Sequence, residues 1–124
     1  MDRNELEKYI SENYKSEAEH LWSSHPTFAV FRHADNRKWF AVIMDIAKNK
    51  LGISGSEHVS VVNLKCDPIL AGSLRYEHGI FPAYHMNKEK WISVLLDGSV
   101  DREKLIFLLN MSYDLTASRK KNRK

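Results

Sequence analysis

The chain has 124 residues, 43% of them hydrophobic, with one cysteine and a formal net charge of +3. This length suits a single domain, and the apolar runs fall far short of the roughly 20 residues that cross a bilayer, which excludes a membrane-spanning helix. The charged N-terminus lacks the apolar core of a signal peptide, and a single cysteine, Cys66, excludes an internal disulfide, so we expect a cytoplasmic protein.

The first predicted element is a helix over residues 3–14. Asp2 or Asn4 can cap its N-terminus, with Glu5 or Glu7 three positions later as in a capping box. An apolar face follows at helical spacing, formed by Leu6, Tyr9, Ile10 and Tyr14.

Three strands are predicted next, over residues 27–32, 38–46 and 58–65, because these stretches are rich in β-branched and aromatic residues. Residues 34–37 read as a turn, and residues 48–57 as a flexible link. The strand over 38–46 has no polar face and is therefore expected at the centre of the sheet. Strict alternation places Trp39, Ala41 and Ile43 on one of its faces, and Phe40, Val42 and Met44 on the other.

The second helix carries the clearest local signal. Asp67 is predicted to cap it, Pro68 occupies the first helical position, and Gly79 suits a left-handed C-terminal cap. A hairpin follows, with strands over 81–86 and 90–96. Ser99 is predicted to cap the last helix, whose buried face is formed by Leu105, Leu108, Leu109 and Leu115.

The element order is therefore α-β-β-β-α-β-β-α. Short links between strands demand antiparallel pairing, so we predict an α+β fold with a five-stranded antiparallel sheet packed by helices. One domain is expected over residues 1–118. The last six residues, 119–124, carry five positive charges and no apolar residue, and they are predicted to be a disordered basic tail.

The charge is unevenly distributed along the chain. Without the tail, 14 basic residues face 16 acidic ones, so the body has a net charge of −2. Residues 1–25 sum to −3, residues 26–92 to +3, and residues 93–118 to −2. Nucleic-acid binding by the body therefore requires local clustering of the positive residues of the middle segment.

Recognised catalytic and metal-binding patterns are absent from the sequence. The six histidines do not occur at metal-ligand spacing, and Cys66 reads as a small buried hydrophobe. There is no phosphate-binding glycine loop and no nucleophile elbow. We therefore expect a protein that is not an enzyme, with no metal and no cofactor.

One segment, FPAYHMNKEKW, is rich in aromatic, hydrogen-bonding and basic residues. Lysines there can neutralise phosphates, and Asn87 and His85 can hydrogen-bond to phosphates or base edges. An ordinary edge hairpin, whose lysines oppose aggregation, is the alternative reading of the same residues. Arg32, Arg37 and Lys38 form a second basic cluster, and Trp39 and Trp91 are expected to be half-buried or in the core.

From His25 to Leu115 the chain resembles the MmcQ/YjbR family of small bacterial proteins. The segments that carry the resemblance are HPTFAVFRHADNRKWFAVI, NLKCDPILAGSLR, FPAYHMNKEKWISVLLDG and LLNMSYDL. The resemblance implies an α-β(3)-α-β(2)-α fold, related in shape to secretion chaperones, and DNA binding through a double wing of β-hairpins. The residues that match the family's pattern are Lys65, Asp67, Pro68, Arg75, His85, Asn87, Lys88 and Trp91.

Three functions remain open from the sequence. The first is a DNA-binding protein that uses basic hairpin wings. Its candidate nucleic-acid-binding residues are Arg32, Lys38, Lys65, Arg75, His85, Asn87, Lys88 and Lys90. The second is a protein-interaction adaptor with a groove for a partner segment, and the third is a small-ligand pocket formed by Lys65, Arg75 and His85. The protein is expected to be a monomer without contact to a membrane.

Overall fold

The structure is a computed structural model and describes residues 1–118; the predicted basic tail, 119–124, lies outside the described residues. The elements follow the expected order, and the fold class is α+β. They are α1 (Arg3–Tyr14), β1 (Ala29–Arg32), β2 (Trp39–Ala47), the 3-10 helix η1 (Lys48–Leu51), β3 (His58–Lys65), α2 (Pro68–Leu74), β4 (Ile80–Pro82), β5 (Trp91–Leu95) and α3 (Arg102–Thr116).

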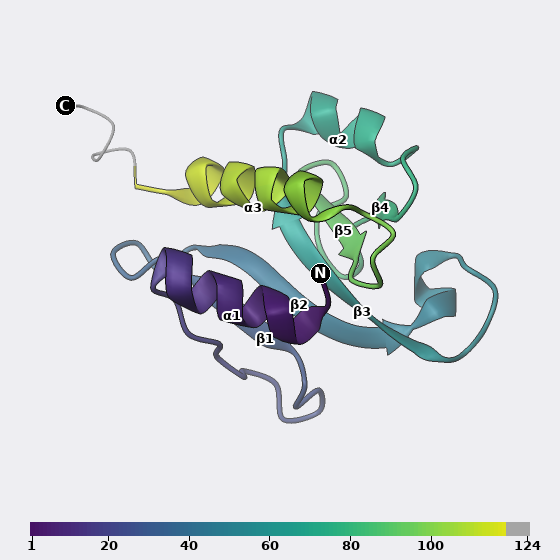
Figure 1. Cartoon of the computed structure of the whole chain (residues 1–124), viewed down its shortest axis with the longest axis horizontal. Helices are drawn as coiled ribbons and strands as arrows, with labels where there is room; N and C mark the ends of the chain where they lie inside the picture. The colour runs from purple at the N-terminus through teal and green to yellow at the C-terminus, as the bar shows by residue number, and fades with distance from the viewer. Residues whose placement is uncertain (119–124) are drawn as a thin grey trace.

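The five strands form one sheet in the order β1-β2-β3-β5-β4, and every neighbouring pair is antiparallel. The predicted sheet is therefore confirmed. Helices α1 and α3 lie across one face of it (Figure 1). Buried residues of all three helices join the core cluster on that face, among them Leu6, Ile10, Ala71, Leu74, Leu105, Leu108 and Leu109.

Helix capping follows the local sequence signals. The carboxylate of Asp2 accepts a hydrogen bond from the backbone amide of Glu5, and the carboxylate of Glu5 accepts one from the backbone amide of Asp2. Helix α1 therefore begins with a complete capping box. The carboxylate of Asp67 accepts hydrogen bonds from the backbone amides of Ile69 and Leu70 and so caps α2, whose first residue is Pro68. These predictions are confirmed.

A β-bulge changes the face assignment predicted for β2. Phe31 pairs with Ala41, but Arg32 pairs with Trp39, so Phe40 is the extra residue between the two pairs. An extra residue reverses the alternation of side chains beyond it. Trp39 therefore lies with Val42 and Met44, and Phe40 with Ala41 and Ile43, the opposite of the predicted arrangement.

Several element ends also differ from the prediction. Helix α2 ends at Leu74, so Gly79, with a φ of +85°, serves the turn before β4 instead of the helix end. Asp101 caps α3, because Ser99 is held in a turn by the side chain of Asp97. Leu115 is 47% exposed because it lies on the outer side of α3 near the exposed Phe107, whereas Thr116 in the same turn is buried.

The predicted strand over 81–86 is shortened to β4. Residues 83–90 form an irregular loop between β4 and β5. The predicted flexible link after β2 begins with the helical turn η1, which ends at Gly52 with a φ of +83°.

Candidate functional site

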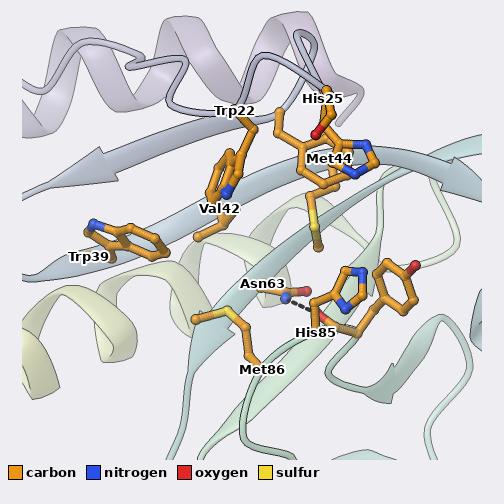
Figure 2. A pocket seen from close by; sticks show the side chains of 11 residues that line it. Trp22, His25, Trp39, Val42, Met44, Asn63, His85 and Met86 are labelled. Carbon is orange, nitrogen blue, oxygen red and sulfur yellow. Dashed lines mark hydrogen bonds between the residues drawn. The ribbon is translucent and has the colours of Figure 1, made fainter.

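The second face of the sheet carries no helix among the described residues. Its apolar side chains form a separate buried cluster that includes Phe28, Val42 and Met44. Two irregular segments, residues 15–28 and 83–90, border this face and enclose a pocket of about 390 Å³, the aromatic groove (Figure 2). The groove is lined by Trp22, Ser24, His25, Phe28, Trp39, Val42, Met44, Asn63, Tyr84, His85 and Met86.

One wall of the groove is built from packed rings. The ring of Trp22 meets those of Trp39 and Phe28 edge to face, with centroids 5.8 and 5.9 Å apart. The ring of His25 stacks on Phe28 at 4.5 Å, with only 10° between the planes. Edge-to-face and stacked rings stabilise each other beyond simple burial, so this wall is a preformed aromatic surface.

The other wall is the loop that carries Tyr84, His85 and Met86, and a buried polar clamp holds it to the sheet. The Nδ2 of Asn63 donates to the carbonyl oxygen of Tyr84 at 2.9 Å, and the amide of Tyr84 donates to the Oγ of Ser93 at 3.0 Å. Ser93 in turn donates to the Oδ1 of Asn63 at 2.5 Å. Asn63 and Ser93 are fully buried, so the N–H and C=O groups of Tyr84 are both held by side chains that water does not reach.

The backbone at His85 is unusual. His85 has a φ of +64°, the left-handed region that non-glycine residues rarely adopt. This conformation holds the exposed His85 ring against the ring of Tyr84, with centroids 3.9 Å apart. Such strain at the rim of a pocket is typical of functional sites.

Basic residues gather at one end of the sheet, next to the groove. The pairs Ala41–Leu64 and Lys65–Trp91 show that β2 and β5 begin where β3 ends. The turn over 33–38, the end of β3 and the loop over 83–90 therefore meet at this end, which we call the basic end. Lys38, Lys65 and Lys90 lie there, and none of the three makes an ion pair with any described residue.

Two cation–aromatic pairs cross the sheet at the basic end. Arg32 pairs with Trp39, and Lys65 pairs with Trp91. Because side chains alternate along a strand, Lys65 shares the face of Asn63, and Trp91 that of Ser93. Both tryptophans are half-buried, as expected. The groove face thus ends in a row of alternating positive and aromatic side chains.

Some predicted nucleic-acid-binding residues have internal partners. Arg32 forms two hydrogen bonds with Glu19, at 2.5 and 3.0 Å, and they hold the pKa of the Glu19 carboxyl below its usual value. The side chain of Asn87 accepts the amides of Glu89 and Lys90, and the Nζ of Lys88 donates to the carbonyl of Ala83 at 2.9 Å. These groups shape the loop.

Arg75 lies apart from the other candidates. It is the C-terminal cap of α2, whose buried side chains pack on the helix-covered face, whereas His85 lines the groove on the opposite face. The structure does not bring Arg75 together with Lys65 and His85, the three residues of the small-ligand hypothesis.

The acidic side chains of the basic end reduce its net charge. Asp35, Asp67 and Glu89 are exposed in the same turns as the lysines. Asp67 is engaged by two backbone amides at the start of α2, and Asp35 accepts the amide of Asn36. The lysine ammonium groups therefore remain the more available charges.

Cys66 is buried and free, as predicted. Burial raises the pKa of its thiol, and its Sγ faces the Sδ of Met111 at 3.9 Å. A raised pKa leaves the thiol protonated and a poor nucleophile. Within residues 1–118, no three His, Cys, Asp or Glu side chains group as metal ligands would, and no helix is long and apolar enough to span a bilayer.

Sequence reasoning missed most of the groove. Trp22, His25 and Phe28 lie in or next to a segment without periodicity, so no pattern marked them as neighbours of residues 84–86. Asn63 was the available signal, because a polar residue inside the apolar strand HVSVVNLK must find a buried partner.

Comparisons with known proteins connect the chain to small bacterial proteins. The YjbR family profile matches residues 11–115. Over 116 residues the chain is 34% identical to the uncharacterized protein YyaQ of Bacillus subtilis, and the matched region covers 94% of this chain and 98% of YyaQ. Over 58 residues it is 40% identical to the uncharacterized protein YjbR of Escherichia coli, covering 46% of this chain and 49% of that one.

Solved structures share the whole fold. A crystal structure of a Pseudomonas syringae protein, 46% identical, superposes with a TM-score of 0.93 over 94% of this chain and all of that one. A Deinococcus radiodurans protein, 27% identical, gives a TM-score of 0.71 over 99% of this chain and 82% of that one.

Proposed function

The chain belongs to the YjbR family, and from this premise we propose that it is a non-enzymatic nucleic-acid-binding protein whose basic end contacts phosphates. The observation that supports this proposal most is the meeting of Lys38, Lys65 and Lys90, from three separate segments, at one end of the sheet. Ammonium groups without a carboxylate partner are suited to replace the counterions of a phosphate backbone. The hairpin turn over 33–38 and the loop over 83–90 are the two wings.

The hydrogen bonds within the basic end distinguish residues that can contact a phosphate from residues that hold the loop in shape. Lys38 and Lys90 are exposed and contact phosphates, whereas Asn87 and Lys88 hold the loop in shape. Arg32 keeps its bonds to Glu19 and positions the edge of the sheet. The DNA-binding role that the family resemblance implies is thus assigned to fewer residues than the sequence suggested.

The test is salt-dependent binding to a mixed-sequence DNA duplex. Replacing both Lys38 and Lys90 by alanine removes two phosphate contacts, so the slope of log K against log salt should fall by about 1.8, at about 0.9 per contact. Lys50→Ala is the matched control, because Lys50 is exposed in η1 at the opposite end of the sheet and should leave the slope unchanged.

The tail requires its own control, because RKKNRK binds any polyanion by charge alone. The comparison is therefore repeated with a chain that ends at Ser118. Complete loss of binding by this shorter chain at low salt would refute the proposal.

A second candidate function is the protein-interaction adaptor, and the apolar floor of the aromatic groove favours it. An adaptor receives an apolar partner segment in the groove and is insensitive to salt. If the shorter chain binds no nucleic acid, this function becomes the leading one.

A further inference from the structure

We infer that the aromatic groove holds an unpaired base, so that the preferred ligand of this protein is a single nucleic-acid strand and not a duplex. This inference rests on the proposed function and names the form of nucleic acid that the same surface recognises. Its starting point is the position of the groove directly beside the basic end.

The dimensions and lining of the groove suit a planar ring. A volume of about 390 Å³ falls within the range of small-molecule sites. The ring wall of Trp22, Trp39 and His25 and the loop wall of His85 and Met86 flank the floor of the groove on opposite sides (Figure 2). A base held between them has aromatic surface available to it from both walls, the interaction on which single-strand-binding proteins rely.

The lysines lie within reach of a strand whose base occupies the groove. Lys65 is two residues beyond Asn63 on the same face, about 7 Å along the strand. Lys38 lies in the exposed turn at the same end of the sheet. In one strand of a duplex, successive phosphates rise by about 3.4 Å along the helix axis, and an unpaired strand can extend further. A strand that leaves the groove toward the basic end therefore passes the Lys65 ammonium group within one or two nucleotides.

The floor of the groove predicts that a base is bound by stacking and not by hydrogen bonds to its edge. The Oδ1 and Nδ2 of Asn63 each make one bond in the clamp with Ser93 and Tyr84, and the side chain is fully buried, so it presents no exposed edge to a base. Recognition through ring faces tolerates every base, because each base has a π-face. We therefore expect weak sequence preference.

A peptide strand is the less suitable occupant. Strand addition needs a free sheet edge, but Glu19 already pairs with Val30 on the outer edge of β1, through backbone bonds of 2.9 and 3.0 Å. The other edge strand, β4, has three residues and ends at Pro82, which lacks an amide to donate. The positive row beside the groove also favours a polyanion.

The experiment compares binding of the full-length chain to a dye-labelled 12-mer of thymidine, the same sequence in uridine, and a 12-base-pair duplex, by fluorescence anisotropy. A duplex has the higher charge density, so the basic tail can only favour the duplex. Tighter binding of either single strand than of the duplex therefore supports the inference.

Two groove variants locate the effect. Trp39→Ala removes part of the ring wall, and His85→Asn removes a ring from the loop wall while keeping a residue that tolerates positive φ. Each should weaken single-strand binding between about fivefold and a hundredfold, the range for loss of one stacked base. Tyr76→Ala and His58→Asn are matched controls, because both residues are exposed and lie outside the groove.

The possible results separate the two proposals. Equal binding of strand and duplex, unaffected by the groove variants but reduced by Lys38→Ala and Lys90→Ala, would overturn the inference and leave the proposed function standing. Absence of binding to all three oligonucleotides would overturn both. If the groove variants instead abolish binding of an amphipathic Leu- and Phe-containing peptide and leave oligonucleotide binding intact, the groove is a peptide site and the inference is wrong.

Discussion

Replacing Ser93 by alanine removes the hydroxyl group at the centre of the clamp that holds the loop wall. Two polar groups then lose a partner: the amide of the half-buried Tyr84, which donates to the Oγ at 3.0 Å, and the fully buried Oδ1 of Asn63, which accepts from it at 2.5 Å. An orphaned buried polar group costs about 1–3 kcal/mol. With two such groups, the free energy of unfolding should fall by about 2–6 kcal/mol, a large part of the roughly 5–15 kcal/mol typical of a domain.

Urea unfolding measures this loss. The midpoint should decrease while the m-value stays constant, because the surface exposed on unfolding is unchanged. Ser60→Ala is the matched control: its Oγ donates to Asp45 at 2.5 Å, but the pair is only half-buried and water can replace the hydroxyl. We expect a loss below about 1 kcal/mol for this control.

Native-state hydrogen exchange gives the local readout. The Tyr84 amide should exchange much faster in Ser93→Ala than in the unaltered protein, because its acceptor is gone. A loss of stability below about 1 kcal/mol, with Tyr84 still protected, would show that the loop is held by packing and that the clamp reasoning is wrong.

Three further outcomes follow from particular residues. Asp67→Ala should lower stability by about 0.5–2 kcal/mol through loss of the α2 cap, measured by urea unfolding, without loss of oligonucleotide binding; a stable variant that cannot bind would contradict the capping role. Gly79→Ala should destabilise more than Gly52→Ala in thermal melts: both have positive φ, but only at Gly79 does a Cβ meet other atoms, at 2.8 and 2.9 Å. Because burial raises the pKa of Cys66, little thiolate forms at neutral pH, so a thiol reagent should react only after unfolding; fast labelling of the folded chain would disprove the protonated, buried state.

The fold was predictable because its signals are local. A capping box at Asp2 and Glu5, and a cap at Asp67 followed by Pro68, mark two helix starts whatever the tertiary context. Strand β3 was predicted at its observed bounds since a turn-rich link and a helix cap flank it. The short β4 was overpredicted, because aromatic and β-prone residues at 81–86 serve a loop that crosses the sheet face instead of a ladder.

The candidate site was less predictable, because residue type does not reveal which partner a polar group finds. Asn87 and Lys88 have the chemistry of phosphate contacts, yet local backbone groups use both. An Asn side chain in a turn commonly accepts hydrogen bonds from the amides two and three residues ahead, so the internal role of Asn87 could have been predicted from the sequence. The pairing of Arg32 with Glu19 was not, since it depends on a backbone bridge between segments without a common pattern.

The bulge at Phe40 connects the fold to the groove. With strict alternation, Trp39 would face the helices and Phe40 the groove; the extra residue exchanges them. Phe40 then lies fully buried beneath the helices, with ring centroids 4.9 Å from Tyr113 and 5.7 Å from Tyr14. The larger indole, whose N–H needs a polar partner or water, goes to the half-open face, where it meets Trp22.

The exchange also sets the order of charges around the groove. Trp39 faces the groove and pairs with Arg32, whereas Lys38, the residue before it, accepts a backbone hydrogen bond from His33 and lies in the exposed turn at the basic end. Without the bulge, strict alternation over the same sequence would turn Trp39 to the helix face and remove it from the ring wall. The bulge in β2 is therefore what places Trp39 in the groove beside the basic end, and the further inference depends on it.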